Sequence, residues 1–276
     1  MDTRSPVLIA VAPNGARRTR SDHPRLPITP LELAACAQEC LAAGASMLHL
    51  HVRDNQGRHT LDPDLYNEAI TAIRHRVGDD LILQVTTEAA GIYSPPEQIA
   101  AIDALRPEAV SIAVRELFGA GGDEMTPASF LHSLAGRATF VQYIVYGLED
   151  VRRCVSLHAA GIIPQQRPCV LLVLGSYKEQ RAGTPTDLLP LVSALPRDWC
   201  WSSCAFGASE LQCVITSALL GGDIRVGFEN NLQLPWGETA SNNAALVQAA
   251  VAALSPLGFR AATCAEARQR LRALSA

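Results

Sequence analysis

Short apolar runs alternate with longer amphipathic segments along the whole chain. Eight runs have the composition and length of strands, and they lie at residues 7–15, 46–54, 81–89, 109–116, 139–147, 169–175, 199–206 and 223–231. The segments between and after them predict helices, at residues 29–45, 64–77, 95–105, 126–135, 149–161, 186–195, 210–222 and 241–254, with a short terminal helix at 265–274. Strand and helix therefore alternate eight times.

The start of the first helix is marked by its capping residues. Thr29 suits the N-cap, Pro30 the first helical position, and Glu32 completes a capping box. Strands that alternate with helices predict a parallel sheet of the α/β class. Eight such units in 276 residues predict a closed (β/α)8 TIM barrel, for which ~250 residues is typical. We expect a single barrel domain over residues 1–276, ending in the short C-terminal helix.

The alternative architecture is an open doubly wound sheet. A glycine-rich phosphate loop after the first strand would favour it, but the chain has APNGARRT there instead of G-x-G-x-x-G. The N-terminal run resembles a first strand and its turn more than a signal peptide.

Composition limits the kinds of partner. Hydrophobic residues make up 48% and charged residues 18% of the chain, which indicates a packed protein. A net charge of −4 without a long charged run predicts neither nucleic-acid nor membrane binding, and no apolar stretch is long enough to span a bilayer. The eight cysteines form no C-x-x-C pair, so we expect reduced thiols and a cytoplasmic location.

Two histidines share one face of the second predicted strand, in LHLHVRD. His49 and His51 are two residues apart near the carboxyl end of that strand, where barrel enzymes place their chemistry. Neutral imidazole is a common zinc ligand. Arg225, Gly227 and Glu229 share a face of the eighth strand, which contributes to the same interior layers, so Glu229 completes a possible His2Glu set. The alternatives are a hydrogen-bonded core pair and an exposed loop carboxylate.

The other histidines fall on predicted helices and loops, where we interpret them as solvated or structural. They are His23, His59, His75, His132 and His158. The fifth and sixth predicted strands contain no histidine, unlike those of the metal-dependent amidohydrolase barrels.

The motifs LPITPxE, HLHVRD, QVTT and GGDIRVGFENN follow one another in the chain. In this order and separation they resemble the β-keto acid cleavage enzymes, whose best-known member cleaves 3-keto-5-aminohexanoate. The resemblance covers nearly the whole chain. It implies a (β/α)8 enzyme, commonly a tetramer, that transfers the acyl part of a β-keto acid to coenzyme A. Acetyl-CoA would be the co-substrate and acetoacetate the co-product. It also implies one zinc ion per chain, held by His49, His51 and Glu229.

The resemblance extends to other positions of the site. Arg225 matches the family's active-site arginine, and Thr86 lies where the family usually has a serine. Zinc would hold the ketone and carboxylate oxygens of the substrate and polarise the ketone, while Arg225 could orient a carboxylate. We expect Asn14, Gly15, Arg17 and Thr87 to contact the substrate.

Three positions depart from the family pattern. Asn230 follows the zinc glutamate, where an acidic residue normally acts in proton transfer, and an amide cannot act as a base. Arg17 replaces a glutamate that helps to hold the substrate's amino group, which favours an acidic or neutral substrate unless Arg17 is solvated. Glu88 stands where small residues are usual. We hypothesise that Glu88 supplies the carboxylate that Asn230 lacks; alternatively it pairs with Arg17.

Two other functions stay open at this point. A Schiff-base keto acid lyase would use Lys178, the single lysine of the chain, which follows the sixth predicted strand. A non-catalytic barrel that binds metal and a metabolite is favoured by Asn230.

Overall fold

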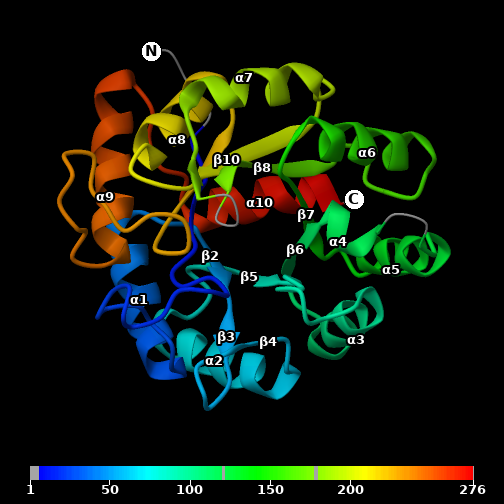
Figure 1. Cartoon of the computed structure of the whole chain (residues 1–276), viewed down its shortest axis with the longest axis horizontal. Helices are drawn as coiled ribbons and strands as arrows, with labels where there is room; N and C mark the ends of the chain where they lie inside the picture. The colour runs from blue at the N-terminus through cyan, green and yellow to red at the C-terminus, as the bar shows by residue number, and fades with distance from the viewer. Residues whose placement is uncertain (1–5, 120–121, 177–179, 276) are drawn as a thin grey trace.

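The computed structural model describes residues 6–119, 122–176 and 180–275. Eight parallel strands close into a barrel, with β11 paired to β1 and β10 paired to β8 (Figure 1). The barrel strands are β1 (Ile9–Val11), β2 (Met47–Leu50), β5 (Ile82–Thr86), β6 (Ala109–Ala113), β7 (Phe140–Val145), β8 (Cys169–Ser176), β10 (Cys200–Ala205) and β11 (Asp223–Val226). The predicted (β/α)8 barrel is confirmed. Short antiparallel pairs are added by β3 (Val52–Arg53) with β4 (His59–Thr60), and by β9 (Arg181–Ala182) with β8.

Helices surround the barrel in chain order (Figure 1). They are α1 (Pro30–Ala43), α2 (Pro63–Val77), α3 (Pro95–Leu105), α5 (Met125–Gly136), α6 (Leu148–Ala159), α7 (Pro185–Ala194), α8 (Glu210–Leu219) and α9 (Asn243–Leu254), with the short α4 (Val114–Leu117) and the 3-10 turn η1 (Ser255–Leu257). The predicted capping box of α1 is confirmed, because Thr29 and Glu32 each bond the other's backbone N–H. No helix among the described residues is long and apolar enough to cross a membrane.

The last helix, α10 (Cys264–Ser275), closes one end of the barrel. It lies across the middle of the ring in Figure 1. Leu271 and Leu274 pack with Met47 and Phe140, which lie at the amino ends of their strands. The carboxyl ends at the opposite mouth are therefore left for the loops that build a site.

Most predicted strands end earlier than expected, and the two described next show the cause. The run at 109–116 leaves the sheet at Ala113, and residues 114–117 form α4. The run at 223–231 ends at Val226 because Gly227, at φ +139°, approaches the Ala12 carbonyl so closely that a Cβ would lie 2.3 Å from its oxygen. Glu229 therefore lies on a turn, so the prediction that it shares a strand face with Arg225 by alternation was wrong, although the two side chains do meet.

Candidate active site and metal centre

Three side chains converge at the carboxyl ends of the strands. His49 lies in β2 and His51 directly after it, and their Nε2 atoms are 3.0 Å apart. The Glu229 carboxylate arrives from the turn after β11. Its Oε2 lies 3.3 Å from Nε2 of His51 and 3.7 Å from Nε2 of His49. The sequence prediction that these three residues come together is thus confirmed in its outcome, although the turn at Gly227 supplies the means.

The three ligand atoms fit a metal ion. In a tetrahedral zinc site with bonds of ~2.1 Å, neighbouring ligand atoms lie about 3.4 Å apart, close to the separations found here. The Oε2 atom of Glu229 is buried and has no hydrogen-bond partner among the described residues. Burial lowers the pKa of His49 to about 3, so its imidazole is neutral, as a ligand must be. Burial opposes ionisation of Glu229, but Arg225 and the two histidines hold its pKa well below the usual range.

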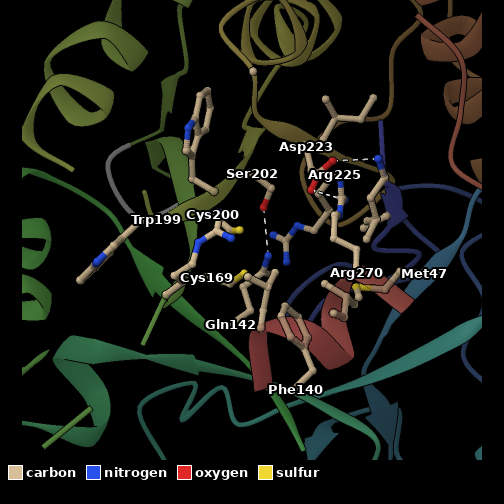
Figure 2. Close-up of a pocket in the computed structure, with 18 of the residues that line it drawn as sticks. Met47, Phe140, Gln142, Cys169, Trp199, Cys200, Ser202, Asp223, Arg225 and Arg270 are labelled. Atoms are coloured by element: carbon tan, nitrogen blue, oxygen red, sulfur yellow. Dashed lines mark hydrogen bonds and ion pairs between the residues drawn. The ribbon is translucent and has the colours of Figure 1, made fainter. Parts of the chain in front are cut away.

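A chain of hydrogen bonds inside the barrel orients His49. Its Nδ1 donates to Oε1 of Gln84 at 2.9 Å, because the amide oxygen can only accept. Nε2 of Gln84 donates to Gln142 at 3.2 Å, and Gln142 donates to the Ser202 hydroxyl at 3.0 Å, a bond drawn in Figure 2. These residues lie on the third, fifth and seventh barrel strands, whose side chains share a layer. These hydrogen bonds fix His49 in the tautomer whose Nε2 lone pair faces Glu229.

Gln142 and Ser202 were not identified from the sequence. The available signal was a polar residue at an inward position of an otherwise apolar strand, as in FVQYIV. Buried amides need partners, so such positions indicate an internal hydrogen-bond network.

Arg225 is buried beside the candidate ligands, with 3% of its surface exposed. Its Nη2 donates to Oε1 of Glu229 at 2.9 Å and to Oδ1 of Asn230 at 3.1 Å. Nη2 also lies 3.2 Å from Sγ of Cys204. Nε and Nη1 have no hydrogen-bond partner among the described residues. Because a buried guanidinium needs acceptors, these two donors can bind an anionic oxygen.

Glu88 faces the centre from the end of β5. One carboxylate oxygen lies 3.9 Å from Nδ1 of His51, and the other lies 3.8 Å from Nη2 of Arg17. Burial raises the pKa of Glu88. Its backbone carbonyl accepts a hydrogen bond from Nε2 of His59 at 2.8 Å, so His59 supports the loop. The pairing of Glu88 with Arg17, considered as an alternative in the sequence analysis, is therefore present as an ion pair that is longer than a hydrogen bond.

Both threonines of QVTT are engaged within the protein. The Thr86 hydroxyl accepts the Glu88 backbone N–H at 3.0 Å, and the Thr87 hydroxyl donates to the carbonyl of Ser111 at 3.0 Å. These bonds fix the backbone that presents Glu88.

The turn after β1 packs directly on the candidate ligands. Nδ2 of Asn14 donates to the carbonyls of Pro27 at 3.0 Å and His51 at 3.3 Å. Gly15 has φ +59°, and a Cβ there would lie 2.5 Å from Cγ of Glu229. Asn14 and Gly15 therefore position the two ligand-bearing segments. Lys178, the residue considered for a Schiff base, lies outside the described residues.

A family model described as beta-keto acid cleavage enzyme matches residues 6–272. The chain belongs to this family. The predicted family is therefore confirmed, over almost the whole sequence.

Named members of the family are similar to this chain along its length. It is 30% identical over 272 residues to the 3-keto-5-aminohexanoate cleavage enzyme of Fusobacterium nucleatum subsp. nucleatum, covering 96% of this chain and 97% of that protein. It is 29% identical over 277 residues to the 3-oxoadipate:acetyl-CoA acetyltransferase of Cupriavidus necator, covering 96% and 94%. The solved binary complex of ObcA with oxaloacetate superposes with a TM-score of 0.73 at 18% identity, over 90% of this chain and 67% of that one. This likeness shows the fold.

Proposed function

We propose that this protein transfers the acyl part of a β-keto acid to coenzyme A, with acetyl-CoA as co-substrate and acetoacetate as co-product. The convergence of His49, His51 and Glu229 at the barrel mouth carries the proposal. Relatives named as acetyl-CoA transferases support it. In this reaction the bond between C2 and C3 of the keto acid breaks. C2 becomes bonded to the acetyl carbonyl carbon, and C3 becomes the thioester carbon of the new acyl-CoA.

We propose one zinc ion per chain, held by His49, His51 and Glu229. When bound, zinc supplies a Lewis acid that polarises the ketone and carboxylate oxygens of the keto acid. Gln84 keeps His49 in the tautomer that can serve as a ligand.

Arg225 is proposed to orient the substrate carboxylate through its Nε and Nη1 atoms. Asn230 accepts from Nη2 of Arg225 and is a positioning residue, because an amide takes up no proton at neutral pH. Thr86 is proposed to act through Glu88, whose backbone N–H it accepts.

The reaction needs a group that takes a proton from C2 and later returns one. Glu88 is proposed for this role, because its carboxylate lies 3.9 Å from His51 and faces the centre. This contact supports the hypothesis that Glu88 supplies the carboxylate that is missing at residue 230.

The substrate is proposed to be a β-keto acid with a neutral or acidic side group. Arg17 places a positive charge at the edge of the site, and Glu88 offsets part of it at 3.8 Å. An ammonium group on the substrate would be repelled there. Asn14, Gly15 and Thr87 are proposed to shape the same edge of the pocket.

We propose a homotetramer in the cytoplasm. The proposal of a tetramer rests on the resemblance to the family. The proposal of a cytoplasmic location rests on the eight cysteines, which are all free thiols, as is usual in a reducing compartment. Light scattering should give four times the 29.5 kDa chain mass.

The decisive experiment combines metal analysis with a turnover assay. We expect about one zinc per chain and acetoacetate release that depends on acetyl-CoA, with keto acids carrying neutral, carboxylate or amino side groups offered in turn. His49→Ala should lose both zinc and turnover, whereas the control His75→Ala, at an exposed position of α2, should lose neither. Zinc without turnover on any keto acid would contradict the proposed reaction.

A further inference from the structure

Two cysteines lie side by side at the opposite end of the barrel from the candidate metal ligands. Cys169 and Cys200 are the first residues of β8 and β10, and they are direct partners in the parallel register of these strands. Paired residues of neighbouring parallel strands project to the same side of the sheet. Figure 2 shows the two side chains next to each other, facing one pocket.

Their separation suits a disulfide. Neighbouring strands lie about 4.8 Å apart, inside the range of roughly 4.4–6.8 Å between Cα atoms that disulfides span. The two thiols lie close enough for each to shift the pKa of the other. Both are free cysteines, and Cys169 is buried whereas Cys200 is partly exposed.

A cavity gives small molecules access to this pair. It has a volume of about 330 Å³ and lies between α10 and the amino ends of the strands. Its lining includes both cysteines and Arg270, which are labelled in Figure 2, together with Arg167 and Arg197. A molecule of the size of hydrogen peroxide needs only slightly more room than a water, whose share of the liquid is about 30 Å³.

The surroundings favour the thiolate of Cys200. The neighbouring thiol of Cys169, with the positive charges of Arg167 and Arg270, lowers the pKa of Cys200 to about 7, against opposition from burial and Asp223. Asp223 is itself paired with Arg270 at 2.5 Å. The other partly exposed cysteine, Cys264, differs, because burial raises its pKa.

We infer that Cys169 and Cys200 form a reversible oxidation site that reacts with hydroperoxides. The Cys200 thiolate attacks a peroxide oxygen, the O–O bond breaks, and hydroxide leaves, so that Cys200 becomes a sulfenic acid. The Cys169 sulfur then attacks the Cys200 sulfur, and the S–S bond forms as water leaves. Two thiols and one hydrogen peroxide thereby give one disulfide and two waters. The inference does not rest on the proposed reaction, although Arg225 lines this cavity and also bonds Glu229.

The test is limited oxidation of the folded, full-length protein with hydrogen peroxide, followed by alkylation and peptide mapping. We expect a cross-linked peptide pair joining Cys169 to Cys200, a mass loss of two hydrogens, and full recovery of both thiols with dithiothreitol. The inference fails if oxidation leaves these two cysteines as alkylated thiols, or converts Cys200 to a sulfinic acid without a cross-link.

Variants separate the role of Cys200, which attacks the peroxide, from that of Cys169, which closes the disulfide. Cys169→Ala should leave a sulfenic acid on Cys200 that dimedone labels, and Cys200→Ser should abolish both labelling and cross-linking. Cys264→Ser is the matched control and should leave the cross-link unchanged. Within the wild-type chain, Cys36 and Cys40 are a second control, since their sulfurs are 3.9 Å apart but both are buried. Cross-linking of that pair before Cys169 and Cys200 would also overturn the inference.

Discussion

Gln84 orients His49 in the candidate metal centre although it is not itself one of the candidate ligands. Its amide oxygen accepts a hydrogen bond from His49 Nδ1, and its amide nitrogen donates one to Gln142. Without an acceptor at this position, the imidazole could rotate or adopt the other tautomer, and its Nε2 would no longer be fixed opposite Glu229. We therefore expect this residue, which lies outside the proposed ligand set, to affect metal binding.

The variant Gln84→Leu tests this role. We expect zinc affinity to fall about 10- to 100-fold, as is usual when the partner of a ligating histidine is removed, measured by competition with a chelator. Gln98→Leu is the control, because Gln98 is equally buried but lies on α3. Equal affinity of Gln84→Leu and the wild type would show that the strand alone orients His49.

Glu88→Gln tests the proton-transfer role. Turnover should fall about 10²- to 10⁴-fold, the usual contribution of a general base, with zinc content unchanged. Arg17→Gln serves as the comparison, since it breaks the same 3.8 Å contact but leaves the carboxylate in place. Similar losses in both variants would mean that the Arg17 contact itself matters, and undiminished turnover of Glu88→Gln would exclude Glu88 as the base.

At the scale of elements, periodicity predicted all eight barrel strands and the helices that follow them. Helix starts were recovered within about two residues, because local residues such as Thr29 and Pro30 determine them. Strand ends were less predictable. The end of β11 depends on a contact between Gly227 and Ala12, which are distant in sequence. His49, His51 and Glu229 were found from spacing and resemblance, whereas the supporting amides follow from packing across strands.

The turn from Gly227 to Asn231 is the element that carries Glu229. Gly227→Ala should strain it by at least about 1–3 kcal/mol from the backbone conformation alone, and the Ala12 carbonyl would also be displaced. We expect a lower melting temperature and weaker zinc binding. Gly136→Ala is the control, since nothing lies within 4 Å of the added Cβ at the end of α5. An unchanged melting temperature in Gly227→Ala would contradict this view of the turn.

The first residue of α8 supports the same turn. The Glu210 carboxyl group accepts from the Gly227 backbone and from Asn231, both at 3.2 Å, and burial raises its pKa to about 8. The folded protein thus keeps a proton that the unfolded chain releases above about pH 4.3.

It follows that Glu210 makes the free energy of unfolding decrease as pH rises from about 4.3 to 8, by up to about 1.4 kcal/mol per pH unit. The variant Glu210→Gln, which does not titrate, should flatten this decline in urea titrations at several pH values. If wild type and variant show the same pH dependence, Glu210 is ionised in the folded state.

At the scale of the whole molecule, the barrel separates two kinds of chemistry. The histidines and Glu229 lie toward the carboxyl ends of the strands, and the cysteine pair lies at the amino ends beside α10. Arg225 joins the two regions, because it bonds Glu229 and also lines the cavity beside the cysteines. The hydrogen-bonded side chains of Gln84, Gln142 and Ser202 run from His49 to this cavity, which Gln142 and Ser202 line. At the carboxyl ends of the strands, we propose that C2 of a keto acid becomes bonded to an acetyl group.

Isotope tracing tests that claim most directly. Acetyl-CoA carrying carbon-13 at both acetyl carbons is supplied with an unlabelled β-keto acid, and the products are resolved by mass spectrometry. The account predicts acetoacetate with two labelled carbons and an acyl-CoA with none. Label in the acyl-CoA product, or unlabelled acetoacetate, would contradict it.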